Sequence, residues 1–129
     1  MENKHKIYDQ ICGIAFANIY CSAKREGRIV LFSFDAKNKG HLFVLGVARG
    51  VCGALQTDLF IKCSWWTLHK LNKKIPKQMR MKRANKDDKN SAIDTNELLD
   101  FVREVCAETE LSEISFADIY DEYYSGKEQ

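Results

Sequence analysis

The spacing of hydrophobic residues predicts a helix at the start of the chain. Between Ile7 and about Lys24, apolar residues recur at intervals of three and four, the period of an α-helix with a wide buried face. Gly27 follows the polar end of this segment, and a glycine there can take the left-handed conformation that ends a helix. The sequence therefore predicts a first helix that stops at Gly27.

The next segment predicts a βαβ unit. Residues 28–34 and 59–63 are rich in β-branched and aromatic side chains, which favours two short, buried strands. The run 41–55 between them fits either a strand returning as a hairpin or a buried helix. We prefer the helix, because Gly46, Gly50 and Gly53 would then form one smooth stripe suited to close packing against a neighbouring backbone. Residues 28–63 would then contain two parallel strands joined by a right-handed crossover.

A third helix is predicted directly after the second strand. Ser64 can cap it, and the only proline, Pro76, should end it. Its core-facing side chains by helical spacing are Trp65, Leu68, Leu71 and Ile75. The segment that follows is poor in apolar residues, so we expect a mobile basic and polar loop at about 77–92, most clearly over 82–92.

The end of the chain predicts two further helices. Residues 94–97 form a capping box, Asp-Thr-Asn-Glu, before a helix with Leu98, Phe101, Val102 and Val105 on one face. Residues 115–118 are a weaker version of the same signal, before a short helix with Phe116, Ile119, Tyr120 and Tyr123 on one face. We therefore expect one domain over residues 1–129, of small α/β (α+β) class: a βαβ-like unit, flanking helices and an acidic helical pair at 94–124.

The formal net charge of +2 conceals two halves of opposite sign. Residues 1–93 carry 18 Lys/Arg against 7 Asp/Glu, whereas residues 94–129 carry 11 Asp/Glu against Arg103 and Lys127 alone. The basic excess is densest between Lys70 and Lys89, and such a field attracts polyanions or acidic protein surfaces.

Composition and cysteine usage favour a globular protein of the cytoplasm. The chain is 45% hydrophobic and 11% aromatic, which can supply a sizeable core. Its N-terminus lacks the pattern of a secretory signal, and the longest apolar run is too short to span a membrane. The five cysteines stand apart from one another, which favours reduced, buried thiols over disulfides. Their spacing does not match that of zinc ligands, so we expect neither a metal nor a cofactor.

The basic segment is the first candidate site, and nucleic acid is its expected partner. Exposed cations near an aromatic platform combine attraction to phosphates with stacking on bases. Trp66, on the exposed side of the helix by residue count, is the expected stacking residue. The candidate nucleic-acid-binding residues are Lys70, Lys73, Lys74, Lys77, Arg80, Lys82, Arg83 and Trp66. A plain solvated face is the alternative.

The acidic C-terminus is the second candidate site, with a basic protein surface as its partner. Its tyrosines could anchor such a contact, as in an adaptor or inhibitor, for example an accessory protein of a phage or mobile element. The candidate residues are Asp118, Tyr120, Asp121, Tyr123 and Tyr124. The acidic helices could instead fold back and mask the basic segment.

Other motifs give weaker signals. Residues 59–72 resemble a helix-turn-helix only faintly, since a strand-like run occupies the place of its first helix. The three glycines match no phosphate-binding loop. Asp35 and His41 could form an acid/base pair, but the sequence supplies neither a nucleophile nor an orienting group, and ordinary turn interactions explain them better. The sequence therefore favours a non-catalytic protein.

Overall fold

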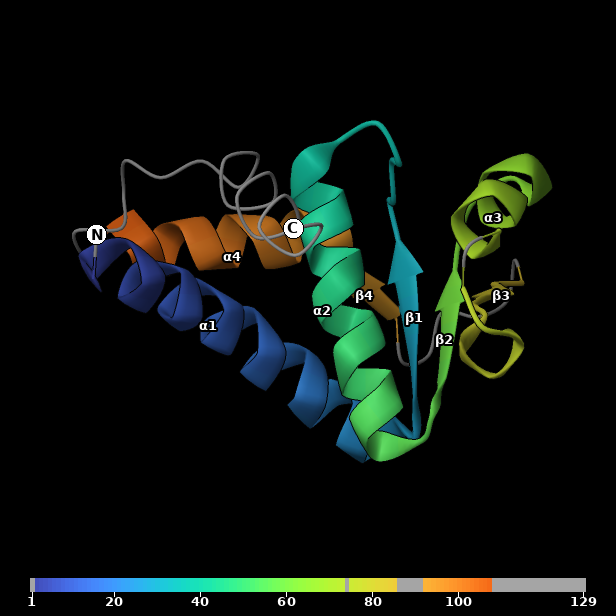
Figure 1. The fold of residues 1–129 in the computed structure, drawn as a ribbon, viewed down its shortest axis with the longest axis horizontal. Coiled ribbons are helices and arrows are strands. Elements are labelled where there is room, and N and C mark those ends of the chain that lie inside the picture. Colours follow the sequence, from blue (N-terminus) through green and yellow to red (C-terminus); the bar gives the residue numbers. More distant parts are fainter. Residues whose placement is uncertain (1, 74, 86–91, 108–129) are drawn as a thin grey trace.

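The computed structural model describes residues 2–73, 75–85 and 92–107, which form four helices and four strands (Figure 1). The α-helices are α1 (Glu2–Glu26), α2 (Lys39–Leu55), α3 (Trp65–Asn72) and α4 (Thr95–Ala107), with a short 3-10 helix, η1 (Lys77–Met79), after α3. The strands are β1 (Arg28–Phe32), β2 (Asp58–Ile61), β3 (Lys82–Arg83) and β4 (Ala92–Asp94). The predicted class, a small α/β fold, is confirmed.

The four strands form one sheet in the order β3-β2-β1-β4, and every neighbouring pair is parallel. β1 and β2 pair from Arg28 opposite Asp58 to Leu31 opposite Ile61, with α2 connecting them, so the predicted βαβ unit is confirmed. β3 and β4 lie at opposite edges of the sheet, although only residues 84–91 separate them in the chain. The basic and acidic parts of the sequence thus leave the sheet at different edges.

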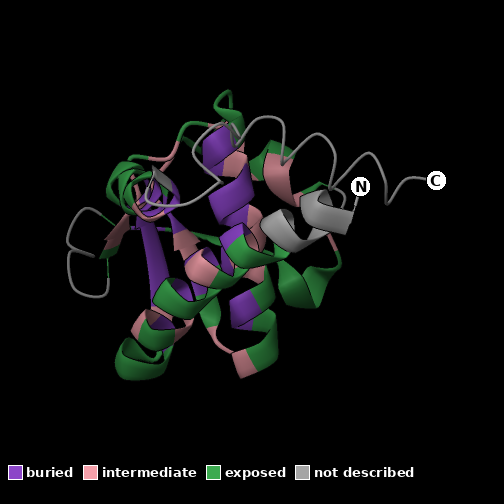
Figure 2. Ribbon diagram, turned by 90° about the vertical axis from the view of Figure 1, so that its left-hand side faces the viewer, coloured by how far each residue is buried: buried purple, intermediate pink, exposed green. Residues whose placement is uncertain are grey.

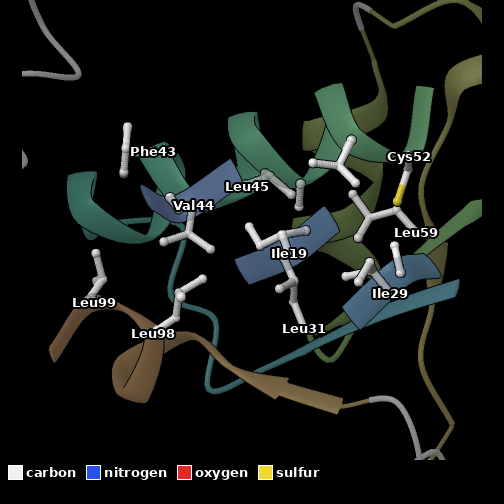
Figure 3. Close-up of a cluster of buried hydrophobic side chains, with 14 of the residues drawn as sticks. Ile19, Ile29, Leu31, Phe43, Val44, Leu45, Cys52, Leu59, Leu98 and Leu99 are labelled. Atoms are coloured by element: carbon white, nitrogen blue, oxygen red, sulfur yellow. The ribbon is translucent and has the colours of Figure 1, made fainter. Parts of the chain in front are cut away.

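The core lies between one face of the sheet and three helices. Side chains of α1, α2 and α4 share one hydrophobic cluster with Ile29, Leu31, Leu59 and Ile61 of the two central strands. Figure 3 shows Leu98 and Leu99 of α4 on the side of α2, and the ribbon places α3 at the far edge of the sheet, beside β2 and β3 (Figure 1). The buried residues concentrate along α2 and the central strands (Figure 2). The helices α1, α2 and α4 therefore cover one face of the sheet, and α3 lies apart from them.

Three local signals in the sequence set element boundaries as expected. Gly27 ends α1 with φ at +77°, and its amide donates to the Ala23 carbonyl at 2.8 Å. The Ser64 hydroxyl caps α3 by accepting from the Thr67 amide at 3.2 Å. A carboxylate oxygen of Asp94 accepts from the amides of residues 96 and 97 at the start of α4. Each boundary depends on a side chain or backbone group next to it, which explains why the sequence predicts it.

Two aromatic residues predicted in the core are exposed instead. Trp65 is 54% exposed, and Phe101 is 44% exposed. α3 has no fully buried residue, and its half-buried Leu68 and Leu71 pack against the core, while the buried stripe of α4 is formed by Leu98, Leu99, Val102 and Cys106. Helical spacing defines a stripe only to within one residue on either side, so residues at its margin can lie in solvent.

The expected close packing is also wrong for Gly50 and Gly53, two of the three glycines in the predicted stripe. Gly50 and Gly53 are exposed, and a Cβ atom built on either would meet nothing within 4 Å. The helix prediction itself is correct, because α2 runs from Lys39 to Leu55 and buries its other side against β1, β2 and the neighbouring helices. Gly50 and Gly53 thus lie on the outer face of α2.

Part of the expected loop at 77–92 is regular structure. Residues 77–79 form η1, residues 82–83 form β3 on the edge of β2, and Ala92 begins β4 beside β1. Residues 86–91 lie outside the described part of the chain. α3 ends at Asn72, before the proline expected to end it, and Pro76 precedes η1 instead. These strands are two and three residues long, and such short segments have too few residues for a period to be detected.

The five cysteines are free, and they differ in exposure. Cys52 and Cys106 are buried, Cys12 and Cys63 are half-buried, and Cys21 is exposed, so the expectation of buried thiols fails for Cys21. Burial, with a smaller contribution from the Asp58 carboxylate, raises the pKa of the Cys52 thiol to about 11. A thiol reacts with electrophiles as its thiolate, so both burial and protonation protect Cys52 from alkylation.

We expect Cys21 and Cys52 to differ sharply in alkylation by iodoacetamide at pH 8. A pKa raised by about two units lowers the thiolate fraction of Cys52 roughly 100-fold at this pH, and that protection should persist until the pH approaches 11. Peptide mass spectrometry after timed labelling measures both rates, with urea-unfolded protein as the control in which Cys52 reacts freely. Equal rates in the folded protein would contradict the burial of Cys52.

Leu99→Ala and Phe101→Ala, two truncations on the same helix, should have unequal effects on stability. Leu99 is 2% exposed, and its truncation should lower the free energy of unfolding by about 2–5 kcal/mol through lost contacts and a cavity. Phe101 is 44% exposed, and its truncation should cost about 1 kcal/mol or less. Urea unfolding followed by far-UV circular dichroism measures both, and a larger loss for Phe101→Ala would support the sequence-based prediction instead.

Candidate nucleic-acid interface

α3 presents an aromatic and basic surface on the side opposite its two half-buried leucines. Successive residues of a helix are 100° apart around its axis. Leu68 and Leu71 pack against the core, so the residues on the other side of α3 face solvent. The exposed residues of this surface are Trp65, Trp66, His69, Lys70 and Lys73. The exposed position expected for Trp66 is confirmed, at 69%.

The three rings on this surface contact one another. Trp65 and Trp66 meet edge to face with ring centroids 4.9 Å apart, and the His69 ring stacks on Trp65 at 5.0 Å with an interplanar angle of 8°. The indole of Trp65 thus lies between an aromatic edge and an imidazole face, while much of its surface stays in solvent. Such an arrangement offers flat apolar surface for a further planar group to stack on.

A hollow of about 190 Å³ lies beside these rings. Trp65, His69 and Asn72 of α3 line it together with Lys73 and with Arg80, which follows η1. An aromatic ring and two cations from separate segments therefore border one concavity. This is the combination that binds a base together with its phosphate.

Asn72 determines where Arg80 and β3 lie relative to α3. Its amide nitrogen donates to the Met81 carbonyl at 2.9 Å, and its amide oxygen accepts from the Met81 amide, also at 2.9 Å. The Met81 side chain is buried in the core, which fixes this segment from the other side. Asn72 is thus a positioning residue for the hollow.

The cations of β3 continue the surface along the edge of the sheet. The Lys82 ammonium lies 5.8 Å from the centre of the Phe60 ring and 3.2 Å from an Asp58 carboxylate oxygen. The Arg83 Nε donates to the Cys63 carbonyl at 3.1 Å. Both side chains are exposed, so these contacts direct them without removing them from solvent.

We call this whole surface the basic face. Its members are Trp65, Trp66, His69, Lys70, Lys73, Lys77, Arg80, Lys82 and Arg83, all exposed. No Asp or Glu occurs in the sequence between Asp58 and Asp87, so these charges have little opposite charge nearby in the chain. Lys74 lies outside the described residues, and the other seven candidates from the sequence belong to the basic face.

α4 carries acidic side chains at the opposite edge of the sheet. It follows β4 and packs against α1, α2 and β4, whereas the basic face surrounds β3. The part of the acidic segment that the structure describes therefore does not cover the basic face. Asp118, Tyr120, Asp121, Tyr123 and Tyr124, the candidates for a protein contact, lie outside the described residues.

A second and larger pocket adjoins the basic face. It has a volume of about 310 Å³ and lies between the end of α2, the start of β2 and η1. Two arginines, Arg49 and Arg80, line it, together with the polar residues Gln56, Thr57 and Gln78. Arg80 lines both hollows, so the two are neighbours.

The polar groups after β1 and β4 bond to one another. The His41 Nδ1 accepts from the Asp35 amide at 2.9 Å, so its Nε2 carries the proton and donates to Asn96 at 2.7 Å. The Ser33 hydroxyl donates to Asp94 at 3.2 Å, and the Thr95 hydroxyl donates to the Phe32 carbonyl at 2.8 Å. Ligands often bind at this edge of parallel sheets, but here Asp35 and His41 serve to join the turn after β1 to the start of α4.

Among the aromatic, histidine and arginine residues that line the two hollows, sequence reasoning missed three: Trp65, His69 and Arg49. The Trp-Trp pair was visible, but helical spacing assigned its first member to the core. Arg49 was visible only as a charge that interrupts an apolar run, and nothing in the sequence connects it with Arg80, thirty-one residues later. Only the tertiary structure, which places η1 at the same pocket as the end of α2 and the start of β2, brings the two together.

Within residues 2–73, 75–85 and 92–107, no group of three His, Cys, Asp or Glu side chains is arranged to hold a metal ion. The helices over these residues were also compared with the length and hydropathy that a membrane span requires, and none of them reaches both.

Asn72→Ala should destabilise the protein, because it leaves the Met81 amide and carbonyl without their side-chain partners. The expected loss in the free energy of unfolding is about 1–3 kcal/mol. Asn18→Ala is the matched control, since the Asn18 amide donates only to the Ile14 carbonyl of its own helix and is exposed. Urea unfolding of both variants decides the point, and equal midpoints would contradict the positioning role of Asn72.

Comparison with protein-family models, with curated protein sequences and with solved structures finds no match to this chain, so its function has to be argued from the geometry described above.

Proposed function

We propose that this protein is a non-catalytic nucleic-acid-binding protein that uses the basic face. The observation that carries the proposal is the adjacent pair Trp65 and Trp66, 54% and 69% exposed, on the same basic face as six exposed Lys and Arg side chains. Large aromatic side chains are usually buried, and an exposed pair forms apolar surface that a ligand can cover.

The aromatic residues and the cations of the basic face would contact different parts of a nucleotide, the base and the phosphate. A base that stacks on an aromatic side chain contributes about 1–3 kcal/mol, and stacking tolerates any base. The surrounding cations would neutralise phosphates and release bound counterions, which makes such binding depend on salt. Together these features favour binding with little sequence preference.

The aromatic surface favours unpaired bases. In a duplex, the faces of the bases are covered by their neighbours in the stack, so an indole can reach them only at an end or after a base has been displaced. We therefore infer that single-stranded DNA or RNA binds more tightly than duplex of the same sequence. Phosphate attraction alone would not produce this difference.

Reversing three charges tests the basic face. For Lys73→Glu/Lys77→Glu/Arg80→Glu, fluorescence anisotropy with a labelled single strand should show much weaker binding. The slope of log affinity against log salt should flatten by about 2, since each phosphate contact to a single strand contributes about 0.7. The matched control, Lys24→Glu/Lys37→Glu/Arg103→Glu, changes the net charge equally on exposed residues away from the basic face.

Two outcomes would contradict the proposal. If both triple variants lose affinity equally, net charge and not the basic face governs binding. If the wild-type protein binds neither single strand nor duplex at low salt, the protein does not act on nucleic acid, and a basic protein partner of the acidic C-terminus becomes the hypothesis to test.

The tryptophans provide a second measurement. They are the only two in the chain, so their fluorescence reports on the basic face alone. Titration with a single strand should quench it, and Trp66→Ala should weaken binding about five- to a hundredfold if a base stacks on that ring. Phe16→Ala, which truncates another exposed aromatic residue on α1, is the control and should leave affinity unchanged.

A further inference from the structure

Arg49, which lines the pocket between α2, β2 and η1, has a side-chain donor without a partner among the described residues. The Nε of Arg49 is buried, and no group in the described part of the chain accepts a hydrogen bond from it. A donor withdrawn from water without a replacement acceptor is costly to a folded protein. An acceptor supplied by a ligand would remove that cost.

The pocket also has the charge to hold an anion. Arg49 of α2 and Arg80 at the end of η1 both line it, so two arginines from separate elements border one space. Asp58 is the acidic residue in the lining, and its carboxylate already accepts from the Lys82 ammonium at 3.2 Å. Guanidinium groups bind phosphate through paired hydrogen bonds, which makes arginine well suited to this ligand.

The position of the pocket connects it with the basic face. Arg80 lines this pocket and also the hollow beside Trp65 and His69. A nucleotide whose base stacks beside Trp65 therefore has a phosphate site within reach of its own backbone. Arg80 is the one residue that the linings of the two hollows share.

We propose that this pocket binds a terminal phosphate of a nucleic-acid strand, with Arg49 and Arg80 as its ligands. A terminal phosphate carries up to two negative charges where a phosphodiester carries one, and two arginines match the larger charge. Residues of α2, β2 and η1 all line the pocket, and a terminal phosphate can enter such a recess without the strand having to continue through it. This inference rests on the proposed function and adds recognition of the strand end to it.

The test compares one short single strand in three forms: with a 5′-phosphate, with a 3′-phosphate and with hydroxyl groups at both ends. Quenching of tryptophan fluorescence gives the dissociation constant of each. We expect one phosphorylated end to raise affinity about tenfold over the hydroxyl form. Arg49→Gln, which removes the charge and keeps a polar side chain of similar length, should abolish that gain and leave affinity for the hydroxyl form nearly unchanged.

The matched control is Arg103→Gln, which makes the same change on exposed α4 and should keep the tenfold gain. Arg49→Lys should keep part of it, because lysine retains the charge and loses the paired hydrogen bonds. Thermal unfolding of each variant excludes loss of the fold as the cause, and inorganic phosphate, titrated calorimetrically into wild type and Arg49→Gln, tests the pocket without a nucleic acid.

The outcomes separate this inference from the proposed function. Equal affinity of wild type for all three strands would overturn the phosphate pocket and leave the basic face in place. A phosphate gain that persists in Arg49→Gln would overturn the assignment to this pocket. Failure of every strand to bind would overturn the proposed function and strand-end recognition together, and binding of inorganic phosphate that depends on Arg49 would then identify the pocket as an anion site of another kind.

Discussion

The fold depends on the burial of β1 between two parallel neighbours. Ile29, Val30 and Leu31 are each 0% exposed, so both edges and both faces of this strand are withdrawn from water. A buried backbone must find all its hydrogen bonds within the protein, and here β2 supplies them on one side and β4 on the other. The three residues of β4 are therefore essential to the sheet, although they begin the acidic part of the chain.

This constraint also decides where the charges lie. Because β4 completes the sheet at one edge and β3 at the other, the acidic helix α4 and the basic face are directed away from each other. Segments of opposite charge that follow one another in the sequence thus do not neutralise each other over the described residues. A basic face left uncovered by α4 remains available to a polyanion, which is the condition that the proposed function needs.

The parts of the interface that the sequence predicted are those that depend on composition. The clustering of cations between residues 70 and 83 and the exposure of Trp66 both follow from local spacing. Trp65 was assigned to the core because it stands three residues before Leu68, and that assignment failed because α3 is short, lies at the edge of the sheet and buries only a narrow stripe. A helix between two other elements would have buried the wider stripe that the spacing implies.

The sequence by itself determined where α1 ends and where α3 and α4 begin. Gly27, Ser64 and Asp94 act on backbone groups within four residues, so no tertiary information was needed to identify them. Tertiary structure alone decided the order of strands, the pairing of β3 with β2 and of β4 with β1, and the presence of Arg49 and Arg80 at one pocket. These contacts join residues far apart in the chain, and they form because the folded core, rather than any local preference, repays the entropy lost in bringing them together.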